Sequence, residues 1–274
     1  MFQAATYELD NHLATLLLHS LAAVALACFV TQNAGATVID FEGPVNGTEL
    51  VGNEFAGVTI SSSDKGVTHA GPAIFDSSKP GPNDAGADKD LLVNLGNILI
   101  LQNDALTAQT VTPGVFDTPN DEADFGGAGG TGNLLFTFDS AVEVQNITLI
   151  DLNGGAELML VLTDVLGNTL SYGVPEMWTN DVEFCGFACD GYAVFDLQTL
   201  GAQAGEDGGS SITPAPIINN ISGVYDKFSI ESLEITLDGS TPSAGFDNLT
   251  YVPEPGTGVL LGLGLVGLAA RRRR

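Results

Sequence analysis

The chain has 274 residues, of which 34 are acidic and only 8 are basic, which gives a formal net charge of −26. Half of the basic residues are arginines at the very end, so the charges of the rest of the chain are almost all negative. Such a surface repels the phosphate backbone of nucleic acids, which excludes nucleic-acid binding. An anionic surface keeps a protein soluble and attracts divalent cations, and both interpretations of the acidity stay open.

An apolar run of export-signal length occupies Leu13 to Val30. It ends close to Ala34-Gly-Ala36, the small-x-small pattern that signal peptidases require, so we predict that residues 1–36 are a signal peptide cleaved after Ala36. The segment before the run is acidic and lacks the usual Lys or Arg, which leaves two alternatives open. In one, Cys28 is the acylated residue of a lipoprotein; in the other, the run stays uncleaved as a short membrane anchor.

The following segment, from Thr37 to Val252, alternates short apolar runs with clusters of Gly, Asn, Asp and Pro. Apolar and polar residues alternate along 229–237, as in a half-buried strand, and Asp164-Val-Leu-Gly-Asn168 is typical of a hairpin turn. No long stretch shows the 3.6-residue period of a helix. We therefore predict one all-β domain over 37–252, an antiparallel β-sandwich of jelly-roll type, flanked by the signal helix and a C-terminal transmembrane helix. The expected strands include 37–41, 57–61, 134–139, 141–151, 157–164, 192–197, 229–237 and 246–251.

Two loops of this domain concentrate oxygen ligands. The first loop, 83–90, includes Asp88 and Asp90, and the second, 117–127, includes Asp121 and Asp124. Carboxylates two or three residues apart on a Gly-rich loop suit Ca²⁺, although neither loop has the EF-hand pattern. The alternative is that Asp and Asn serve turns and solubility in both loops.

A third Ca²⁺ site is expected where the two ends of the domain meet. The first and last strands of many jelly rolls are neighbours, so Asp40 or Glu42 is expected to meet Asp247 around a structural ion.

Cysteine and tryptophan are rare in the domain. Cys185 and Cys189 are its only cysteines, and in an exported protein they predict a local disulfide that fixes a turn rather than the whole fold. Trp178 is the only tryptophan. Exposed on a sandwich, Trp178 would be a platform for a sugar, together with Tyr172 and Tyr192; packing in the core is the alternative.

An enzymatic function has little support in the residues. The domain has one histidine, His69, and no Gly-x-Ser-x-Gly motif for a nucleophilic serine. A carboxylate pair for glycoside cleavage would be hidden among the many acids, and no two of them stand out. We expect no catalytic residue and a non-enzymatic protein, with a secreted polysaccharide hydrolase as the alternative.

The C-terminus carries the strongest pattern in the chain. Pro253, Glu254 and Pro255 precede an apolar stretch, 256–270, and the chain ends with Arg271, Arg272, Arg273 and Arg274. As a helix the apolar stretch would be ~22 Å long, which is short for a bilayer core but workable when the flanking arginines snorkel. The positive-inside rule keeps the arginines cytoplasmic and places the domain outside. We predict that residues 253–274 form a separate segment.

This tripeptide, apolar segment and basic cluster resemble the PEP-CTERM sorting signal of Gram-negative bacteria, and Pro253, Glu254 and Pro255 match its tripeptide residue by residue. The resemblance implies that a membrane transpeptidase, exosortase, recognises the chain in the inner membrane and processes it. It also implies delivery to the cell surface, the outer membrane or the extracellular matrix. Cargoes of this system are often linked to exopolysaccharide and biofilm production.

Three short motifs of the domain, IDFEG (39–43), GVTI (57–60) and FDNL (246–249), resemble secreted sandwich proteins that often carry such a tail. These proteins resemble galactose-binding-like and lectin-like sandwiches. The resemblance implies a structural or carbohydrate-binding module whose partner is an extracellular polysaccharide.

Overall fold

The computed structural model describes residues 35–64, 71–84, 89–103, 106–121, 132–153, 157–175, 178–179, 191–199, 216–217, 224–238 and 243–254. Within these ranges the chain forms β-strands and no α-helix, and one compact unit spans Ala36–Pro253. The expected signal helix and transmembrane helix lie outside these ranges. Among the residues that are described, no helix is both long enough and apolar enough to cross a membrane.

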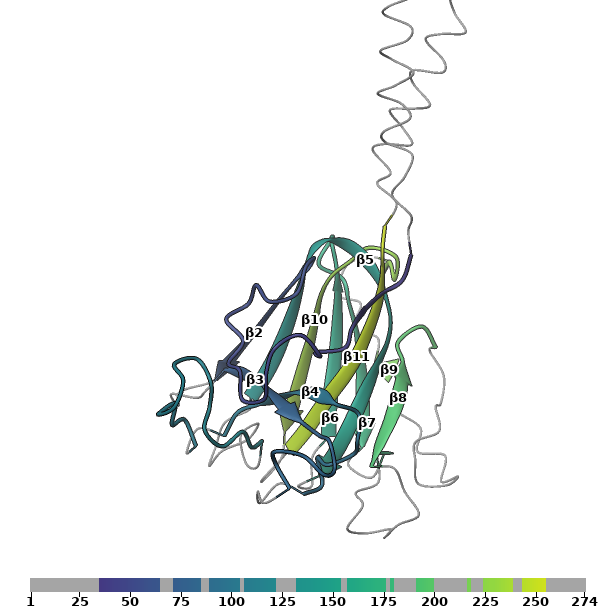
Figure 1. Ribbon diagram of the computed structural model, residues 1–274. Coiled ribbons are helices and arrows are strands. Elements are labelled where there is room, and N and C mark those ends of the chain that lie inside the picture. Colours follow the sequence, from purple (N-terminus) through teal and green to yellow (C-terminus); the bar gives the residue numbers. More distant parts are fainter. Residues whose placement is uncertain are drawn as a thin grey trace, which may run out of the picture. The chain divides into compact units, whose positions relative to one another are not determined.

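All strand pairs are antiparallel (Figure 1). The strands are β1 (Thr37–Ile39), β2 (Val58–Asp64), β3 (Pro72–Asp76), β4 (Asn97–Leu101), β5 (Gly132–Asn153), β6 (Glu157–Asp164), β7 (Thr169–Pro175), β8 (Tyr192–Asp196), β9 (Pro216–Ile217), β10 (Ile230–Asp238) and β11 (Ser243–Pro253).

The long strand β5 connects two groups of strands. Its first part, 132–138, pairs with β2 and β10, and β10 continues the group through β6, β7 and β9. Its later part, 142–153, pairs with β8 and β11, and β11 also pairs with β1 and β4. The partners of β10 on β5 jump from Thr137 to Val142, which marks the place where β5 leaves one group for the other. The predicted antiparallel β-sandwich is confirmed.

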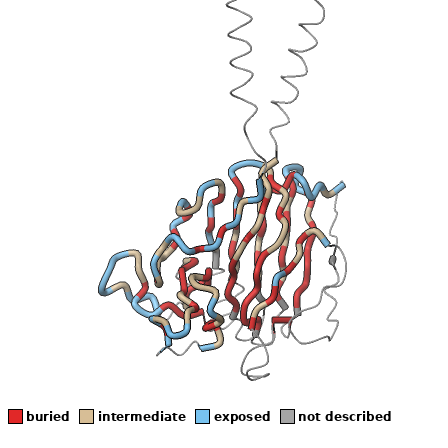
Figure 2. Tube along the Cα trace, turned by 45° about the vertical axis from the view of Figure 1, so that its right-hand side comes forward, coloured by how far each residue is buried: buried red, intermediate tan, exposed pale blue. Residues whose placement is uncertain are grey.

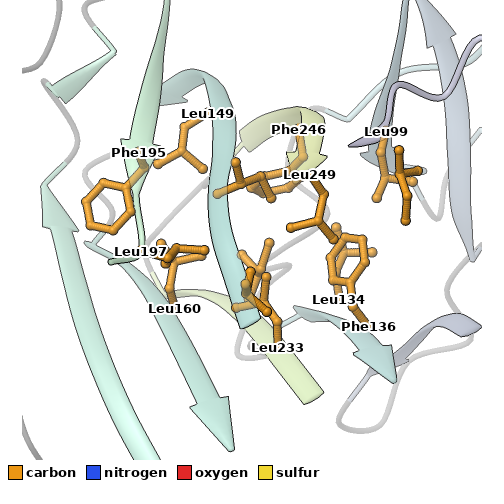
Figure 3. Close-up of a cluster of buried hydrophobic side chains, with 14 of the residues drawn as sticks. Leu99, Leu134, Phe136, Leu149, Leu160, Phe195, Leu197, Leu233, Phe246 and Leu249 are labelled. Atoms are coloured by element: carbon orange, nitrogen blue, oxygen red, sulfur yellow. The ribbon is translucent and has the colours of Figure 1, made fainter. Parts of the chain in front are cut away.

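The main hydrophobic core takes side chains from both strand groups, and apolar residues alternate with polar ones along most of these strands. Figure 3 shows members from β4, β5, β6, β8, β10 and β11 gathered in one cluster. Figure 2 shows the matching alternation of buried and partly exposed residues along the strands. The labelled members of the cluster are Leu99, Leu134, Phe136, Leu149, Leu160, Phe195, Leu197, Leu233, Phe246 and Leu249.

A second, smaller core covers the other face of β3 and β4. Ala73 and Phe75 of β3 and Ile98 and Ile100 of β4 are buried there against Leu91, Leu92, Phe116 and Ile150. Strands β3 and β4 are therefore apolar on both faces, unlike the half-buried strands of the first group.

The predicted hairpin turn joins β6 to β7. Asp164 and Asn168 bracket it, and the carboxylate of Asp164 accepts hydrogen bonds from the backbone N–H groups of Leu166, Asn168 and Asp226 and from the Asn168 side chain. Burial alone would raise the pKa of Asp164, but these donors outweigh it and hold the pKa below its ordinary value. The turn is thereby fixed to the segment that leads into β10.

Candidate functional site

The first and last strands of the domain are neighbours, as predicted from the jelly-roll pattern. Residues Thr37, Val38 and Ile39 of β1 lie opposite Tyr251, Thr250 and Leu249 of β11. This pairing brings the IDFEG segment (39–43) beside the FDNL segment (246–249).

Each of these two segments has one residue in the left-handed backbone region. Phe41 has φ 56°, is fully buried and packs edge-to-face on Phe55 with ring centroids 5.3 Å apart. Asn248 has φ 49°. Such a φ is uncommon outside glycine, so packing and hydrogen bonds must hold both residues in place. The buried ring of Phe41 leaves its neighbours Asp40 and Glu42 exposed.

Asp247 is the buried carboxylate of this junction, with only 2% of its surface exposed. One of its oxygens, Oδ1, accepts a hydrogen bond from the Asn248 backbone N–H at 2.7 Å, and Oδ2 accepts one from the Asn248 side chain at 2.7 Å. Burial, followed by the negative charges of Glu42 and Asp40, raises the pKa of Asp247 to about 7, although the Asn248 N–H acts in the opposite direction.

The two exposed acids are positioned by the backbone around them. The Asn97 N–H at the start of β4 donates to Glu42 Oε1 at 3.1 Å, and the Glu42 N–H donates to Asp40 Oδ1 at 3.3 Å. The negative charges of Asp40 and Glu42 thus act on Asp247, and we call these three residues the junction carboxylates.

The junction carboxylates are not a preformed metal cage. In the described part of the chain, no three His, Cys, Asp or Glu side chains lie close enough together to hold a metal ion. Of the seven Ca²⁺ ligands predicted from the sequence, the structure brings Asp40, Glu42 and Asp247 into electrostatic contact. Binding of Ca²⁺ by this group stays a prediction.

The first predicted Ca²⁺ loop shows turn chemistry in its described part. Asp90 accepts a hydrogen bond from the Leu91 N–H at 3.2 Å. The side chain of Asn83 exchanges hydrogen bonds with that of Asn46 and donates one to the carbonyl of Asp76. Asp88 lies outside the described residues, and a Ca²⁺ site in this loop stays a prediction.

In the second predicted loop, Asp117 also serves a turn. Its carboxylate accepts hydrogen bonds from the Thr110 hydroxyl at 2.5 Å, the Thr110 N–H at 2.9 Å and the Val111 N–H at 3.2 Å. These donors, the Thr110 hydroxyl foremost, lower the pKa of Asp117. Asp121 is fully buried, and Asp124 lies outside the described residues.

Of the two alternatives for Trp178, the structure shows packing in the core and not an exposed sugar platform. Trp178 is fully buried and packs edge-to-face on Phe195 at 5.2 Å between ring centroids. Tyr172 is also buried; its hydroxyl donates to the Leu197 carbonyl at 3.0 Å, and burial raises its pKa to about 12. These rings therefore stabilise the core. The predicted disulfide partners Cys185 and Cys189, and His69, lie outside the described residues.

One feature of the tail could not be anticipated from the sequence. Val252 lies opposite Glu143 and Pro253 lies opposite Val142, so the first proline of the predicted sorting tripeptide is the last residue of β11. A strand end tolerates proline, which lacks the N–H that a ladder would use. The tripeptide thus begins with the last residue of β11.

Comparison with known proteins confirms the predicted C-terminal sorting motif. A family model described as the PEP-CTERM protein-sorting motif matches residues 252–274. A search of curated proteins finds no match. Among solved structures, the family 11 carbohydrate-binding module of the cellulosomal cellulase Lic26A-Cel5E of Clostridium thermocellum is similar at a TM-score of 0.31 and 10% identity, covering 81% of this chain and 96% of that chain. A TM-score this low carries no information about a ligand. The chain thus carries a PEP-CTERM sorting motif behind an antiparallel β-sandwich.

Proposed function

We propose that this protein is exported through the inner membrane, processed there by an exosortase and delivered to the surface or extracellular matrix of a Gram-negative bacterium. There its sandwich serves as a non-enzymatic structural or carbohydrate-binding module associated with exopolysaccharide or biofilm. The observation that carries the proposal is the sorting motif matched at 252–274, in which the tripeptide, the apolar stretch and the terminal arginines occur in order.

The matrix role is supported by the resemblance of the tail to that of cargo proteins linked to exopolysaccharide, and by the charge of the protein. A net charge of −26 keeps a protein soluble outside the cell and attracts divalent cations, which bridge anionic proteins and anionic polysaccharides. The carboxylates of Asp117 and Asp164 are engaged in fixing turns rather than directed at a substrate.

A second candidate function, polysaccharide hydrolysis, is favoured by one observation. A glycosidase needs a carboxylic acid of raised pKa near an ionised carboxylate, and Asp247 with its pKa of about 7 lies near Glu42 and Asp40. Burial of Asp247 and its bonds to Asn248 favour a structural role instead. An activity measurement on Asp247→Asn decides between them.

The sorting part is tested by changing the tripeptide without disturbing β11. Because Pro253 belongs to the strand, the informative variant is Glu254→Ala/Pro255→Ala. We expect the full-length protein to accumulate in the inner membrane with its tail uncleaved, as measured by membrane fractionation and intact mass. The neighbouring pair Gly256→Ala/Thr257→Ala is the matched control and should be released normally. Release of the tripeptide variant at the wild-type rate would contradict the proposal.

The role of the domain is tested with fragment 36–253, the compact unit of the structure. Exopolysaccharide from the producing bacterium should retain the fragment in a pull-down without releasing new reducing ends. Reducing ends that appear with the wild type and disappear with Asp247→Asn would establish the hydrolase instead. Neither retention nor product would reject both functions for this polysaccharide.

A further inference from the structure

One end of the sandwich is defined by a row of paired residues. Pro253 of β11 lies opposite Val142 of β5, Val142 lies opposite Ile230 of β10, and Ile230 lies opposite Asp164 of β6. The row crosses four adjacent strands, a width of ~14 Å at the usual spacing between strands. The hairpin turn after Asp164 is therefore at the same end as the residue where the chain leaves the domain.

Hydrogen bonds join this turn to the segment that precedes β10. The Val165 N–H donates to the Ser229 carbonyl at 2.9 Å, and the Asp226 N–H donates to the Asp164 carboxylate at 3.1 Å. Tyr225 packs against the main core. The turn and the segment 224–229 therefore form one fixed surface.

This surface is apolar where it faces solvent. Val165 and Phe228 are 50% exposed, Leu166 is 79% exposed and Val224 is 86% exposed. Lys227 lies over the Phe228 ring, with its Nζ 5.1 Å from the ring centroid. We call Val165, Leu166, Val224, Lys227 and Phe228 the tether-end patch. Large apolar side chains gathered on a soluble domain indicate a contact surface.

We propose that the tether-end patch docks on the phospholipid surface of the inner membrane while the protein is still anchored there by its C-terminal segment. The apolar stretch begins at Gly256, and the intervening residues reach at most ~10 Å when fully extended. So short a connection keeps the patch within reach of the headgroups and raises its effective concentration at the lipid. Exposed valine, leucine and phenylalanine beside a lysine are the residues that partition into the boundary between headgroups and acyl chains.

The charges at this end determine which lipid surface is preferred. Asp226, Glu231 and Glu143 carry acidic groups on or beside the row, and Lys227 is the cation of the patch. Anionic headgroups repel this surplus of negative charge. Docking is therefore driven by apolar contact and is strongest on zwitterionic lipid.

The test uses the full-length chain reconstituted in phosphatidylcholine vesicles whose acyl chains are brominated near the headgroup. A Phe228→Trp variant reports lipid contact through quenching of its fluorescence, and the native Trp178 is buried in the core. The control is Val194→Trp, a site 58% exposed on β8, opposite Thr148 and ~20 Å along β5 from Val142. We expect strong quenching at residue 228, little at residue 194, and less at residue 228 as phosphatidylglycerol is added.

A second variant separates docking from misfolding. Adding Leu166→Asp/Val224→Asp to Phe228→Trp should weaken docking at least about tenfold, since ~60 Å² of apolar surface corresponds to a tenfold change in partitioning. Circular dichroism verifies that this variant is folded. Equal quenching at residues 228 and 194, or shielding of residue 228 only when exosortase is added, would overturn the lipid proposal. The proposal rests on the proposed function, in which the C-terminal segment anchors the protein. Reconstitution bypasses export and processing, so a failure of lipid docking can be distinguished from a failure of the sorting function.

Discussion

Replacing Asp247 by asparagine removes a carboxylate whose pKa is raised to about 7 in the folded protein, from an ordinary value of 3.8. A raised pKa means that the folded state binds this proton more tightly than the unfolded state. The stability that protonated Asp247 contributes is complete below pH ~4 and is lost as the pH rises through ~7. Asparagine cannot ionise, so the variant avoids this loss.

The size of the effect follows from the shift in pKa. About three units at 1.36 kcal/mol per unit give an upper bound of about 4 kcal/mol. Burial is the largest cause of the shift, but the part that comes from exposed Asp40 and Glu42 is screened by water, so the effect falls below this bound and we expect about 2 kcal/mol. The asparagine side chain also places an N–H group near a donor of Asn248, which costs about 1 kcal/mol at every pH. The informative quantity is therefore the change with pH and not the absolute stability.

The assay is urea unfolding of fragment 36–253 and its Asp247→Asn variant at pH 4 and pH 8. The free energy of unfolding of the variant, minus that of the wild type, should be larger at pH 8 than at pH 4 by about 2 kcal/mol. Glu231→Gln, at an exposed position of β10, makes the same change of charge and is the control. A difference that stays the same at both pH values would refute the assignment of a raised pKa to Asp247.

Two further predictions concern Ca²⁺ binding and Asp164. If the junction carboxylates bind Ca²⁺, CaCl₂ at about 1–10 mM and pH 8, on the order of the dissociation constants of weak extracellular calcium sites, should raise the melting temperature of the wild type. EGTA should reverse this rise and Asp247→Asn should abolish it; a wild type that melts at the same temperature in CaCl₂ and in EGTA would reject the site. Asp164→Ala should lower the free energy of unfolding by about 2–4 kcal/mol, because four donor groups lose their acceptor. Since the pKa of Asp164 is lowered, that loss should shrink as the pH falls below ~4, and a loss independent of pH in urea unfolding would contradict the assignment.

The half-buried strands could be predicted from the sequence because their pattern is local. Alternation along 229–237 located β10, and Asp164 to Asn168 located the turn between β6 and β7. Strands β3 and β4 were not anticipated, because both of their faces are buried and their sequences show no alternation. The predicted strands 134–139 and 141–151 are one continuous β5, since the polar residues between them lie where the strand changes partners.

The candidate site could also be predicted only in part from the sequence. The pairing of β1 with β11, and hence the approach of Asp40 and Glu42 to Asp247, follows from jelly-roll topology. The burial of Asp247 does not, because it depends on neighbours distant in sequence. The choice between the two alternatives for Trp178 also depends on a distant neighbour, because its partner Phe195 lies on β8.

The position of β11 at the end of the domain determines when the sandwich can close. This strand holds β1, β4 and β5 together, yet it is the last part of the domain to follow when a chain crosses a membrane from its N-terminus. Until β11 has emerged, β1 lacks its partner and Phe246, Leu249 and Tyr251 are missing from the main core. Such dependence on distant pairings makes closure of the sandwich a late event. Because β11 ends at Pro253, the export that we propose would complete the domain only when the start of the sorting motif arrives at the membrane.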